Sequence, residues 1–315
     1  MLEKIMHTLR GHPLPDARVI FNPGSGDAAQ SNAELEHIVE TLRELGVRAK
    51  ITRLKPENRI HHIAARAAKR GIPFVVACGG DNTIDLAARG IAGSNTTLVI
   101  VPTGTRNNIA RALNLPQDVV SATYLIKTGQ RARVDVGRVQ VAKRETIFLE
   151  LMTIGLAAAM FPAMDAAQKG DLARLGDLLG TFIAHTPSTF HLNLDAGKQT
   201  ISVEALVLLV LNMPYLGANF QIASSVDYTD GLLDVFLYAD LGKLDLLTYA
   251  IQLTQGFTDD PRVRHLRVKS IQVHTDPPMP VMLDGNVFSE KLLRRGALEL
   301  STAPLALNVM RVPAS

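Results

Sequence analysis

The sequence predicts two domains: an α/β domain built on a parallel sheet, followed by a β-rich domain built from antiparallel strands. Three observations support this prediction. The chain has 315 residues, more than one hydrophobic core usually organises. Its first part alternates short apolar runs with helical patterns. After about residue 131, the apolar runs become strand-like and are joined by Gly, Pro and Asp turns.

The first domain is expected over residues 1–131 and begins with a buried strand, Arg18 to Phe21, that the sequence NPG ends. A helix follows in NAELEHIVETLRELG, where apolar residues recur at spacings of three and four. VRAKITRL and PFVVACGGD are the next strands, separated by the helical stretch NRIHHIAARAAKRG. TIDLAARGIAG, TTLVIVPTGT and RNNIARALNLP continue the alternation. Such alternation favours a parallel sheet with helices on both faces.

The second domain is expected over residues 132–302, and a return of residues 303–315 to the first domain is left open. Between its strands, Ala163 to His185 is predicted to be helical. The strand-like runs are ARVDVGRVQV, RETIFLELMTIG, FHLNLDAG, QTISVEALVLLVLNM, GLLDVFLYAD and RVKSIQVHT.

Composition indicates a folded, soluble protein with 47% hydrophobic and 20% charged residues. No signal peptide is visible, the longest apolar run (ALVLLVL) is too short to span a bilayer, and the single Cys78 rules out an internal disulfide. We therefore expect a cytoplasmic protein without a transmembrane segment.

A net charge of +3 and 5% aromatic residues argue against nucleic-acid binding. The basic run Arg262 to Lys269 favours a solvated strand face, the alternative being weak, peripheral adhesion to an anionic membrane surface.

Three loops rich in small polar residues follow strands of the predicted parallel sheet. In such a sheet, ligands bind beyond the carboxyl ends of the strands. The Gly79-Gly80 pair lets a ligand approach the backbone, and the amides of the next residues open a helix, where anions are attracted. Phosphate is the expected anion. The alternative is that GGDNT is only a tight strand-to-helix connection. The three loops span Asn22 to Gly26, Gly79 to Thr83 and Pro102 to Asn107.

Other chemistries find little support in the sequence. It contains neither a P-loop sequence nor a complete dinucleotide fingerprint, and it has no Gly-x-Ser-x-Gly elbow. In the second half, acids stand at turns in VDYTDGLLDV and VMLDGNVF, where ordinary turn chemistry is the alternative. Among these acids, Asp284 is our preferred candidate for deprotonating an acceptor hydroxyl.

The ordered motifs NPGSG, GGDNT, PTGTRNN, DGLLD and LDGN resemble the diacylglycerol kinase catalytic domain family, which includes bacterial soluble lipid kinases and sphingosine kinases. The resemblance covers nearly the whole chain, from about Arg18 to Val312. It implies a Rossmann-like nucleotide domain of the NAD kinase and diacylglycerol kinase type, joined to a β-rich lipid-substrate domain. It also implies transfer of the γ-phosphoryl group of ATP to a lipid hydroxyl in the cleft between them.

The resemblance also assigns residues. The nucleotide would bind at Thr52, which ends the second strand, at the glycine-rich motif and at the Gly-Thr element, that is at Gly79, Gly80, Asp81, Asn82, Thr83, Gly104 and Thr105. From the small-polar loops themselves, Asn22, Ser25 and Asn107 are further candidates for the same phosphate site. A structural Mg²⁺ would bind Asp230, with help from Asp227 and the carbonyl of Leu232.

The sequence departs from the family pattern at several of these positions. Asn82 replaces a glycine, Asp85-Leu86 replaces Asn-Glu, and Asn108 stands where an acid is expected. Asn286 stands where the family has the glutamate considered the proton acceptor. An ATP-dependent lipid kinase is the first hypothesis. A catalytically weakened nucleotide- or lipid-binding regulator is the second, and an NAD kinase relative with another acceptor is the third. The acceptor lipid and the oligomeric state do not follow from the sequence.

Overall fold

A computed structural model of the chain describes residues 16–27, 29–141, 144–168, 171, 173–216, 220–223, 225–254, 260–288 and 296–313. The chain divides into two compact units. The first unit comprises Met1–Thr105, Asn114–Ala132 and Asn308–Ser315. The second comprises Arg106–Leu113 and Arg133–Leu307. The short helix α5 (Asn108–Ala112), although it follows a loop of the first unit, therefore belongs to the second.

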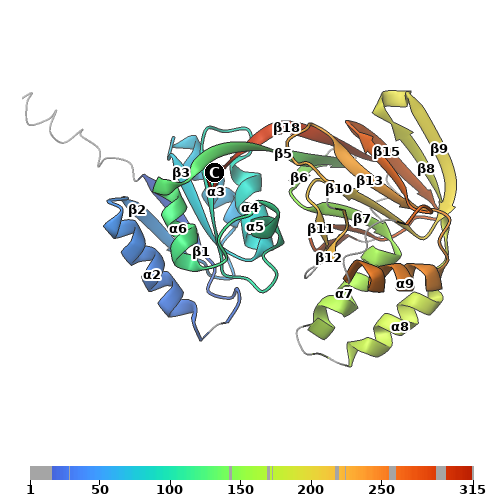
Figure 1. Cartoon of the computed structure of the whole chain (residues 1–315), viewed down its shortest axis with the longest axis horizontal. Helices are drawn as coiled ribbons and strands as arrows, with labels where there is room; N and C mark the ends of the chain where they lie inside the picture. The colour runs from blue at the N-terminus through green and yellow to red at the C-terminus, as the bar shows by residue number, and fades with distance from the viewer. Residues whose placement is uncertain are drawn as a thin grey trace, which may run out of the picture. The chain divides into compact units, whose positions relative to one another are not determined.

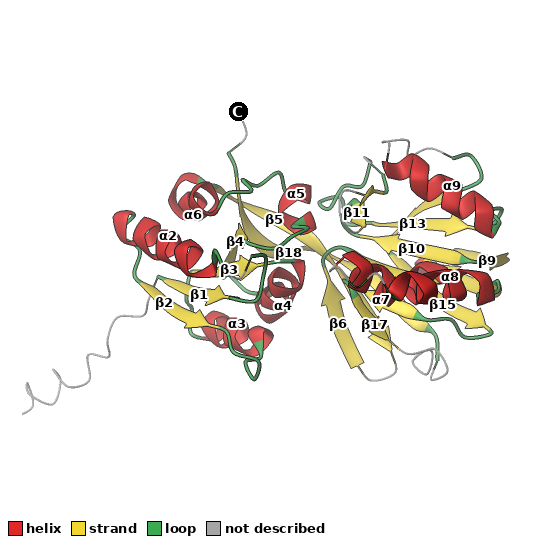
Figure 2. Ribbon diagram, turned by 90° about the horizontal axis from the view of Figure 1, so that it is seen from below, coloured by secondary structure: helices red, strands yellow, loops and turns green. Residues whose placement is uncertain are grey.

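The first unit is a parallel sheet covered by helices on both faces (Figures 1 and 2). Its helices α2 and α6 lie on one face and α3 and α4 on the other. Strands β3 and β4 are buried almost throughout because both of their faces are covered. The strand order is β2-β1-β3-β4-β18, with β1 (Ala17–Phe21), β2 (Ala49–Arg53), β3 (Phe74–Gly79), β4 (Thr97–Pro102) and β18 (Leu298–Arg311). The helices are α2 (Ser31–Glu44), α3 (Ile60–Lys69), α4 (Asp81–Ile91) and α6 (Val119–Thr128).

Strand β18 takes part in both units. In the first unit, Asn308 and Val309 pair in parallel with Thr97 and Leu98 of β4. In the second unit, the beginning of the strand pairs antiparallel with β15. The end of the chain thus contributes a strand to the first unit.

Among the described residues, the second unit contains strands of two larger sheets, a two-stranded sheet and three longer helices. One sheet has the order β14 (Arg264–Val268), β13 (Leu233–Tyr238), β10 (Val207–Leu211), β7 (Leu151–Gly155), β16 (Val281–Leu283), β17 (Asn286–Phe288). The other joins β18 to β15 (Ser270–Asp276), β8 (Ser188–Leu194), β9 (Gln199–Ala205), β5 (Gln130–Val141) and β6 (Arg144–Phe148). The helices are α7 (Leu156–Gln168), α8 (Arg174–Ala184) and α9 (Lys243–Thr254), and the short elements are η1 (Asp195–Gly197), β11 (Tyr215–Leu216) and β12 (Phe220–Gln221).

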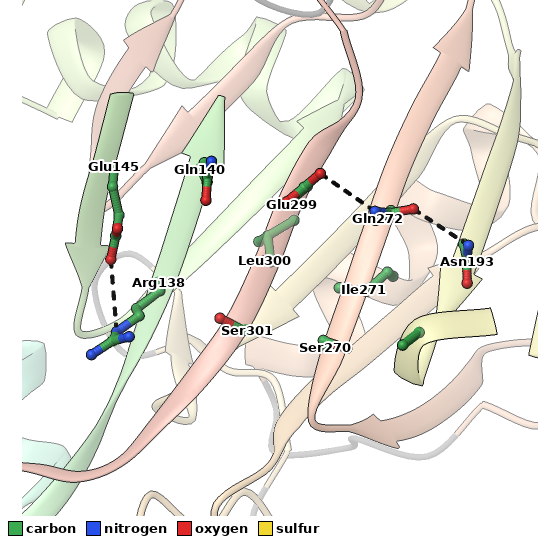
Figure 3. A pocket seen from close by; sticks show the side chains of 11 residues that line it. Arg138, Gln140, Glu145, Asn193, Ser270, Ile271, Gln272, Glu299, Leu300 and Ser301 are labelled. Atoms are coloured by element: carbon green, nitrogen blue, oxygen red, sulfur yellow. Dashed lines mark hydrogen bonds and ion pairs between the residues drawn. The ribbon is translucent and has the colours of Figure 1, made fainter. Parts of the chain in front are cut away.

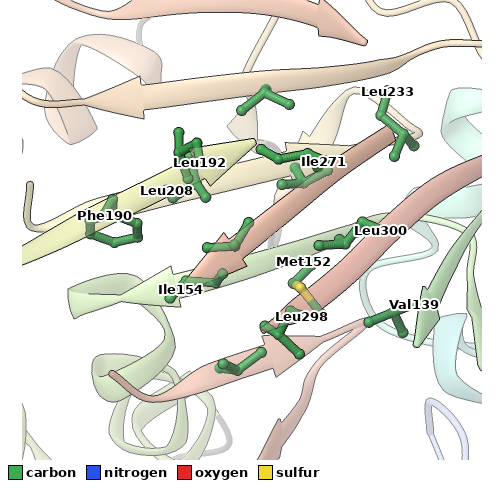
Figure 4. Close-up of a cluster of buried hydrophobic side chains, with 14 of the residues drawn as sticks. Val139, Met152, Ile154, Phe190, Leu192, Leu208, Leu233, Ile271, Leu298 and Leu300 are labelled. Atoms are coloured by element: carbon green, nitrogen blue, oxygen red, sulfur yellow. The ribbon is translucent and has the colours of Figure 1, made fainter. Parts of the chain in front are cut away.

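Two hydrophobic clusters hold the second unit together. In the first, Met152 and Leu208 of one sheet lie in a single cluster with Phe190 and Leu298 of the other (Figure 4). Phe190 is fully buried there, as expected for a sandwich core. In the second cluster, residues on the other face of the six-stranded sheet pack against the helices, with Tyr249 of α9 among them.

The predicted fold class is confirmed: a parallel α/β unit is followed by a β-rich antiparallel unit. Two local predictions were incomplete. Helix α7 begins at Leu156, ahead of the predicted start at Ala163. Helix α9 was not predicted, although Leu244, Leu247 and Ile251 recur with helical spacing. Within the described ranges, no helix is both long and apolar enough to cross a bilayer.

Candidate functional site

The register of the parallel sheet brings the three predicted loops together. Phe21 of β1 is paired with Cys78 of β3, and Gly79 is paired with Pro102 of β4. The loops that follow these residues therefore leave the sheet at the same edge, the carboxyl edge where α/β proteins bind ligands. Cys78 itself is buried, and burial raises the pKa of its thiol well above the ordinary value. It serves as a core residue.

Hydrogen bonds connect the loops directly. The side-chain amide Nδ2 of Asn22 donates to Oγ1 of Thr83 at 2.9 Å. The backbone N–H of Gly80 donates to Oγ of Ser25 at 3.2 Å. The N–H of Thr103 donates to the carbonyl of Gly79, also at 3.2 Å. Each loop is thus held by another loop, which fixes the backbone that a ligand would contact.

Glycine is required where these loops touch. A Cβ on Gly79 would lie 2.5 Å from the Cβ of Thr83, and one on Gly26 would lie 2.2 Å from the carbonyl oxygen of Thr103. Gly26 also has a φ of +67°, a conformation that other residues rarely adopt. The loops therefore approach each other more closely than side-chain-bearing residues would allow.

The start of α4 is suited to an anion. Gly80 precedes the helix in an extended conformation, and no side chain of the described residues caps the helix at this position. Thr103, at the neighbouring loop, is buried, and its Oγ1 has no hydrogen-bond partner among the described residues. A helix start and a buried hydroxyl without a partner fit a phosphate oxygen, because both can donate to it.

Asn82 adopts ordinary helical geometry. It is the second residue of α4, its side chain is exposed, and it is not among the described residues with positive φ. The glycine of the family pattern is therefore not required here for a left-handed backbone. Asp85, another departure from that pattern, is fully buried and forms an ion pair with Arg89 at 2.7 Å within the same helix.

The remaining predicted nucleotide residues lie on β2, at the start of α4 and in the segment that leads to α5. Thr52 lies on β2 opposite Ile20 and is half-buried. Asp81, the first residue of α4, is half-buried, and its carboxylate lies in the helix turn where the dipole favours negative charge. Thr105 is exposed. Asn107 is buried with a φ of 52° and belongs, with α5, to the second unit.

In the second unit, Asp284 is a structural acceptor. Its Oδ2 accepts the backbone N–H of Leu149 at 2.9 Å, and its Oδ1 accepts the N–H groups of Glu150 and Leu151, both at 3.0 Å. The residue is buried at 6% exposure. Adding a proton to either oxygen would weaken the hydrogen bonds it accepts. This geometry does not favour the proton-acceptor role that the sequence suggested for Asp284.

Asn286 lies on the same turn. It begins β17, is exposed, and its Nδ2 donates to the carbonyl of Asp284 at 3.2 Å. An amide at this position supplies no basic oxygen for a proton.

The side chains assigned to a structural Mg²⁺ are engaged in other contacts in this structure. Oδ1 of Asp227 accepts two hydrogen bonds from Thr229, and Asp230 forms an ion pair with Arg267 while its Oδ1 accepts the N–H of Leu232. Among the described residues, no group of three or more acidic, His or Cys side chains could hold a metal ion. Mg²⁺ requires several oxygen ligands in octahedral geometry, and a guanidinium beside Asp230 opposes a cation.

The basic run from Arg262 to Lys269, which contains β14, is paired with acids. Arg262 forms ion pairs with Asp245 and Asp260, at 2.7 and 2.8 Å. His265 contacts Asp234 at 2.6 Å. Burial raises the pKa of Asp234, and its hydrogen bond to His265 partly opposes that shift. These contacts agree with a solvated strand face.

A network around Glu150 was not predicted from the sequence. Asn108, the first residue of α5, donates through Nδ2 to Oε1 of Glu150 at 3.0 Å, and both residues are buried. The N–H of Asn212 donates to the carbonyl of Glu150 at 2.9 Å, and its side-chain Nδ2 donates to the carbonyls of Asp135 and Leu149. Glu150 lies outside the five sequence motifs, so no local pattern marks it as a site residue. Its partner Asn108 is a position that departs from the family pattern, and only the structure shows that the two residues are in contact.

A separate polar pocket of about 260 Å³ lies on the other sheet of the second unit (Figure 3). There, Asn193 donates to Gln272 at 3.3 Å, and Gln272 donates to Glu299 at 3.4 Å. Arg138 and Glu145 form a longer pair at 3.8 Å. These side chains are largely used in contacts with one another across neighbouring strands.

Two family models match the chain. The diacylglycerol kinase catalytic domain matches residues 16–139. The YegS C-terminal NAD kinase beta sandwich-like domain matches residues 153–311. The chain belongs to the diacylglycerol kinase catalytic domain family.

Members of the diacylglycerol kinase family resemble the chain over most of its length. The diacylglycerol kinase of Mycobacterium tuberculosis is 27% identical over 312 residues, covering 96% of this chain and 97% of that protein. The diacylglycerol kinase of Bacillus subtilis is 23% identical over 274 residues, covering 85% and 89%. A diacylglycerol kinase structure from Bacillus anthracis has a TM-score of 0.72 at 20% identity, covering 96% of this chain and 99% of that one. The structural similarity supports the fold.

Proposed function

We propose that this protein is an ATP-dependent lipid kinase that transfers the γ-phosphoryl group to the hydroxyl of diacylglycerol or a related lipid. The observation that carries the proposal is the set of three loops at the carboxyl edge of the parallel sheet, joined by the contacts of Asn22, Ser25 and Gly79. Membership of a lipid kinase family and relatives named diacylglycerol kinase support a lipid acceptor.

The proposed nucleotide role rests on groups at these loops that can donate hydrogen bonds to phosphate. The start of α4 and the buried hydroxyl of Thr103 can both donate to phosphate oxygens. The backbones of Gly80 and Gly104 lie close together, since a Cβ on Gly80 would be 3.4 Å from the Cα of Gly104. When bound, ATP would supply the phosphoryl group, and Mg²⁺ carried with the nucleotide would neutralise phosphate charge. The loops of this chain would bind and orient the phosphates.

The direct test is transfer of labelled phosphate from ATP to a panel of diacylglycerol, sphingoid and phosphatidylglycerol lipids presented in mixed micelles. A labelled lipid product is expected with at least one acceptor. Gly79→Val serves as the nucleotide-site control, because its side chain would enter the space of Thr83. Binding of ATP without transfer to any of these lipids would contradict the kinase proposal.

The second candidate function is a nucleotide- or lipid-binding regulator with little catalytic activity. It is favoured by one observation: neither Asn286 nor Asp284 offers an available basic oxygen on the LDGN turn. Nucleotide binding without transfer in the native protein, together with transfer in Asn286→Glu, is the result that this candidate predicts. Loss of a general base typically costs about 10²–10⁴-fold in rate, so the variant should differ measurably.

A further inference from the structure

Two histidines lie opposite each other on the outer face of the sheet that contains β8 and β15. His191 of β8 is paired with His274 of β15 in the antiparallel register, and both side chains are exposed. Their chain neighbours Phe190 and Val273 belong to the sandwich core. Because side chains alternate along a strand, the two imidazoles point away from that core. Their ring centroids are 6.0 Å apart, and the ring planes are inclined by 24°.

The next strand of the sheet places a hydroxyl group on the other side of His191. Ser202 of β9 is paired with His191 in the register, and its Oγ lies 3.1 Å from Nδ1 of that ring. When the Nδ1–H group donates to this oxygen, the lone pair of the ring is at Nε2, the ring nitrogen farthest from the backbone. Histidines that bind metals usually donate their other ring N–H to an oxygen in this way, which fixes the ring and its tautomer.

The surroundings of the two rings are uncharged and leave room for an ion. The rings line a pocket of about 260 Å³, together with Thr200, Gln272 and Ala297 among others. Among the described residues that line it, none is Lys or Arg, whose charge would repel a cation. On the same face of the sheet, the adjacent amides of Asn193 and Gln272 are hydrogen-bonded to each other (Figure 3).

We propose that His191 and His274 bind a divalent transition-metal ion, with Ser202 as a positioning residue for the ring of His191. Imidazole nitrogens are favoured ligands of Zn²⁺, Cu²⁺ and Ni²⁺. Opposite residues on neighbouring strands have Cβ atoms about 4.5–5.5 Å apart, so rotation of the exposed side chains brings a nitrogen of each ring to one ion. Within the described ranges, no group of three or more acidic, His or Cys side chains could hold a metal, so water completes the coordination of this ion.

The expected consequence is a metal-dependent gain in the stability of the sheet. The ion joins β8 to β15, and its two ligands are far apart in the chain, so that only the folded sheet brings them together. A ligand that binds the folded state alone stabilises it by mass action. The site uses residues of the second unit only and does not depend on the proposed kinase function.

The first test is isothermal titration calorimetry of the full, untagged chain with ZnCl₂, and then with CuCl₂. His191→Asn and His274→Asn each remove one of the two ligands. Each should lower the affinity for Zn²⁺ by about 100-fold, more than the loss of an outer partner usually costs. His62→Asn is the matched control, because His61 and His62 form another pair of neighbouring rings, on α3. It should leave the binding that requires His191 unchanged.

The role of Ser202 is tested separately in the same experiment. Ser202→Ala keeps both histidines but removes the oxygen that fixes one of them, and it should lower the affinity for Zn²⁺ by about 10-fold. Ser202→Thr keeps a hydroxyl group and should retain the native affinity. Equal affinities of the alanine variant and the native protein would overturn the positioning role.

Urea denaturation gives a second measurement of the same site. Zn²⁺ should raise the denaturation midpoint of the native protein and of His62→Asn, but not that of the double variant His191→Asn with His274→Asn. An equal rise in the double variant overturns the proposal. So does an affinity for Zn²⁺ that both single variants leave unchanged, or a native protein that binds neither Zn²⁺ nor Cu²⁺ at millimolar metal. Because both histidines are exposed, their replacement should leave the fold intact without metal.

Discussion

The loops at the edge of the parallel sheet and the turns around β16 and β17 both combine small residues with polar ones, but they are held differently. In the first unit, Asn22, Ser25 and Gly79 join the loops through one amide, one hydroxyl and the backbone. In the second unit, Asp284 alone holds three backbone N–H groups. The carboxylate of an acid in a sequence motif can therefore be occupied by structural hydrogen bonds. A glycine-rich loop, in contrast, keeps its backbone accessible to a ligand because it has no side chains in the way. Four variants test this comparison.

The largest effect is expected for Asp284→Ala. The change leaves three backbone N–H groups of residues 149–151 without their acceptor in a buried place, and hydrogen bonds to a charged group are worth about 1.5–3 kcal/mol each. We expect a loss of roughly 3 kcal/mol or more in the free energy of unfolding by urea denaturation. Glu145→Ala, on the same unit and exposed, is the control. A loss below about 1 kcal/mol would show that Asp284 is not a structural acceptor.

The next largest effect is expected for Gly79→Ala. The added methyl would lie 2.5 Å from the Cβ of Thr83, and such overpacking typically costs about 1–3 kcal/mol. Because the loop must shift to relieve the contact, binding of a non-hydrolysable ATP analogue should weaken as well, as measured by calorimetry. Gly24→Ala is matched to it in the neighbouring loop, since its Cβ would lie 3.5 Å from Asn22 in ordinary contact. Equal effects of the two substitutions would contradict the close packing of Gly79.

A smaller effect is expected for Asn22→Ala. It removes the 2.9 Å hydrogen bond to Thr83, which is worth about 1 kcal/mol in stability. The loops after β1 and β3 should become less well fixed, and the affinity for the ATP analogue should fall about 5-fold, in line with about 1 kcal/mol. Asn32→Ala, which removes an exposed hydrogen bond to Arg53, serves for comparison. An unchanged affinity would mean that this contact does not organise the nucleotide loops.

The smallest effect is expected for Asn82→Gly, which restores the family residue. Since Asn82 is helical and exposed, glycine relieves no strain and should lower the free energy of unfolding by about 0.5 kcal/mol or less. Thermal denaturation of the variant and the native protein measures this difference. A clear gain in stability would indicate that the asparagine is strained after all.

The sequence by itself determined the parallel α/β unit and the β-rich unit, because apolar periodicity and turn residues are local signals. It also located the three loops, because glycine and small polar residues directly after an apolar run can be recognised in the sequence without knowledge of tertiary contacts. It did not reveal helix α9 or the extended start of α7 at Leu156, because an apolar helix on an apolar sheet has no distinct boundary in sequence.

Only the tertiary structure decided what the polar residues contact. Asp284 and Asn108 are separated by well over a hundred positions in the chain, yet both contact Glu150. No local sequence pattern predicts these two contacts. The same holds for Asp230, whose ion pair with Arg267 depends on the pairing of β13 with β14. The charge state and the availability of a carboxylate are set by its neighbours in space, whereas periodicity is set by its neighbours in the chain.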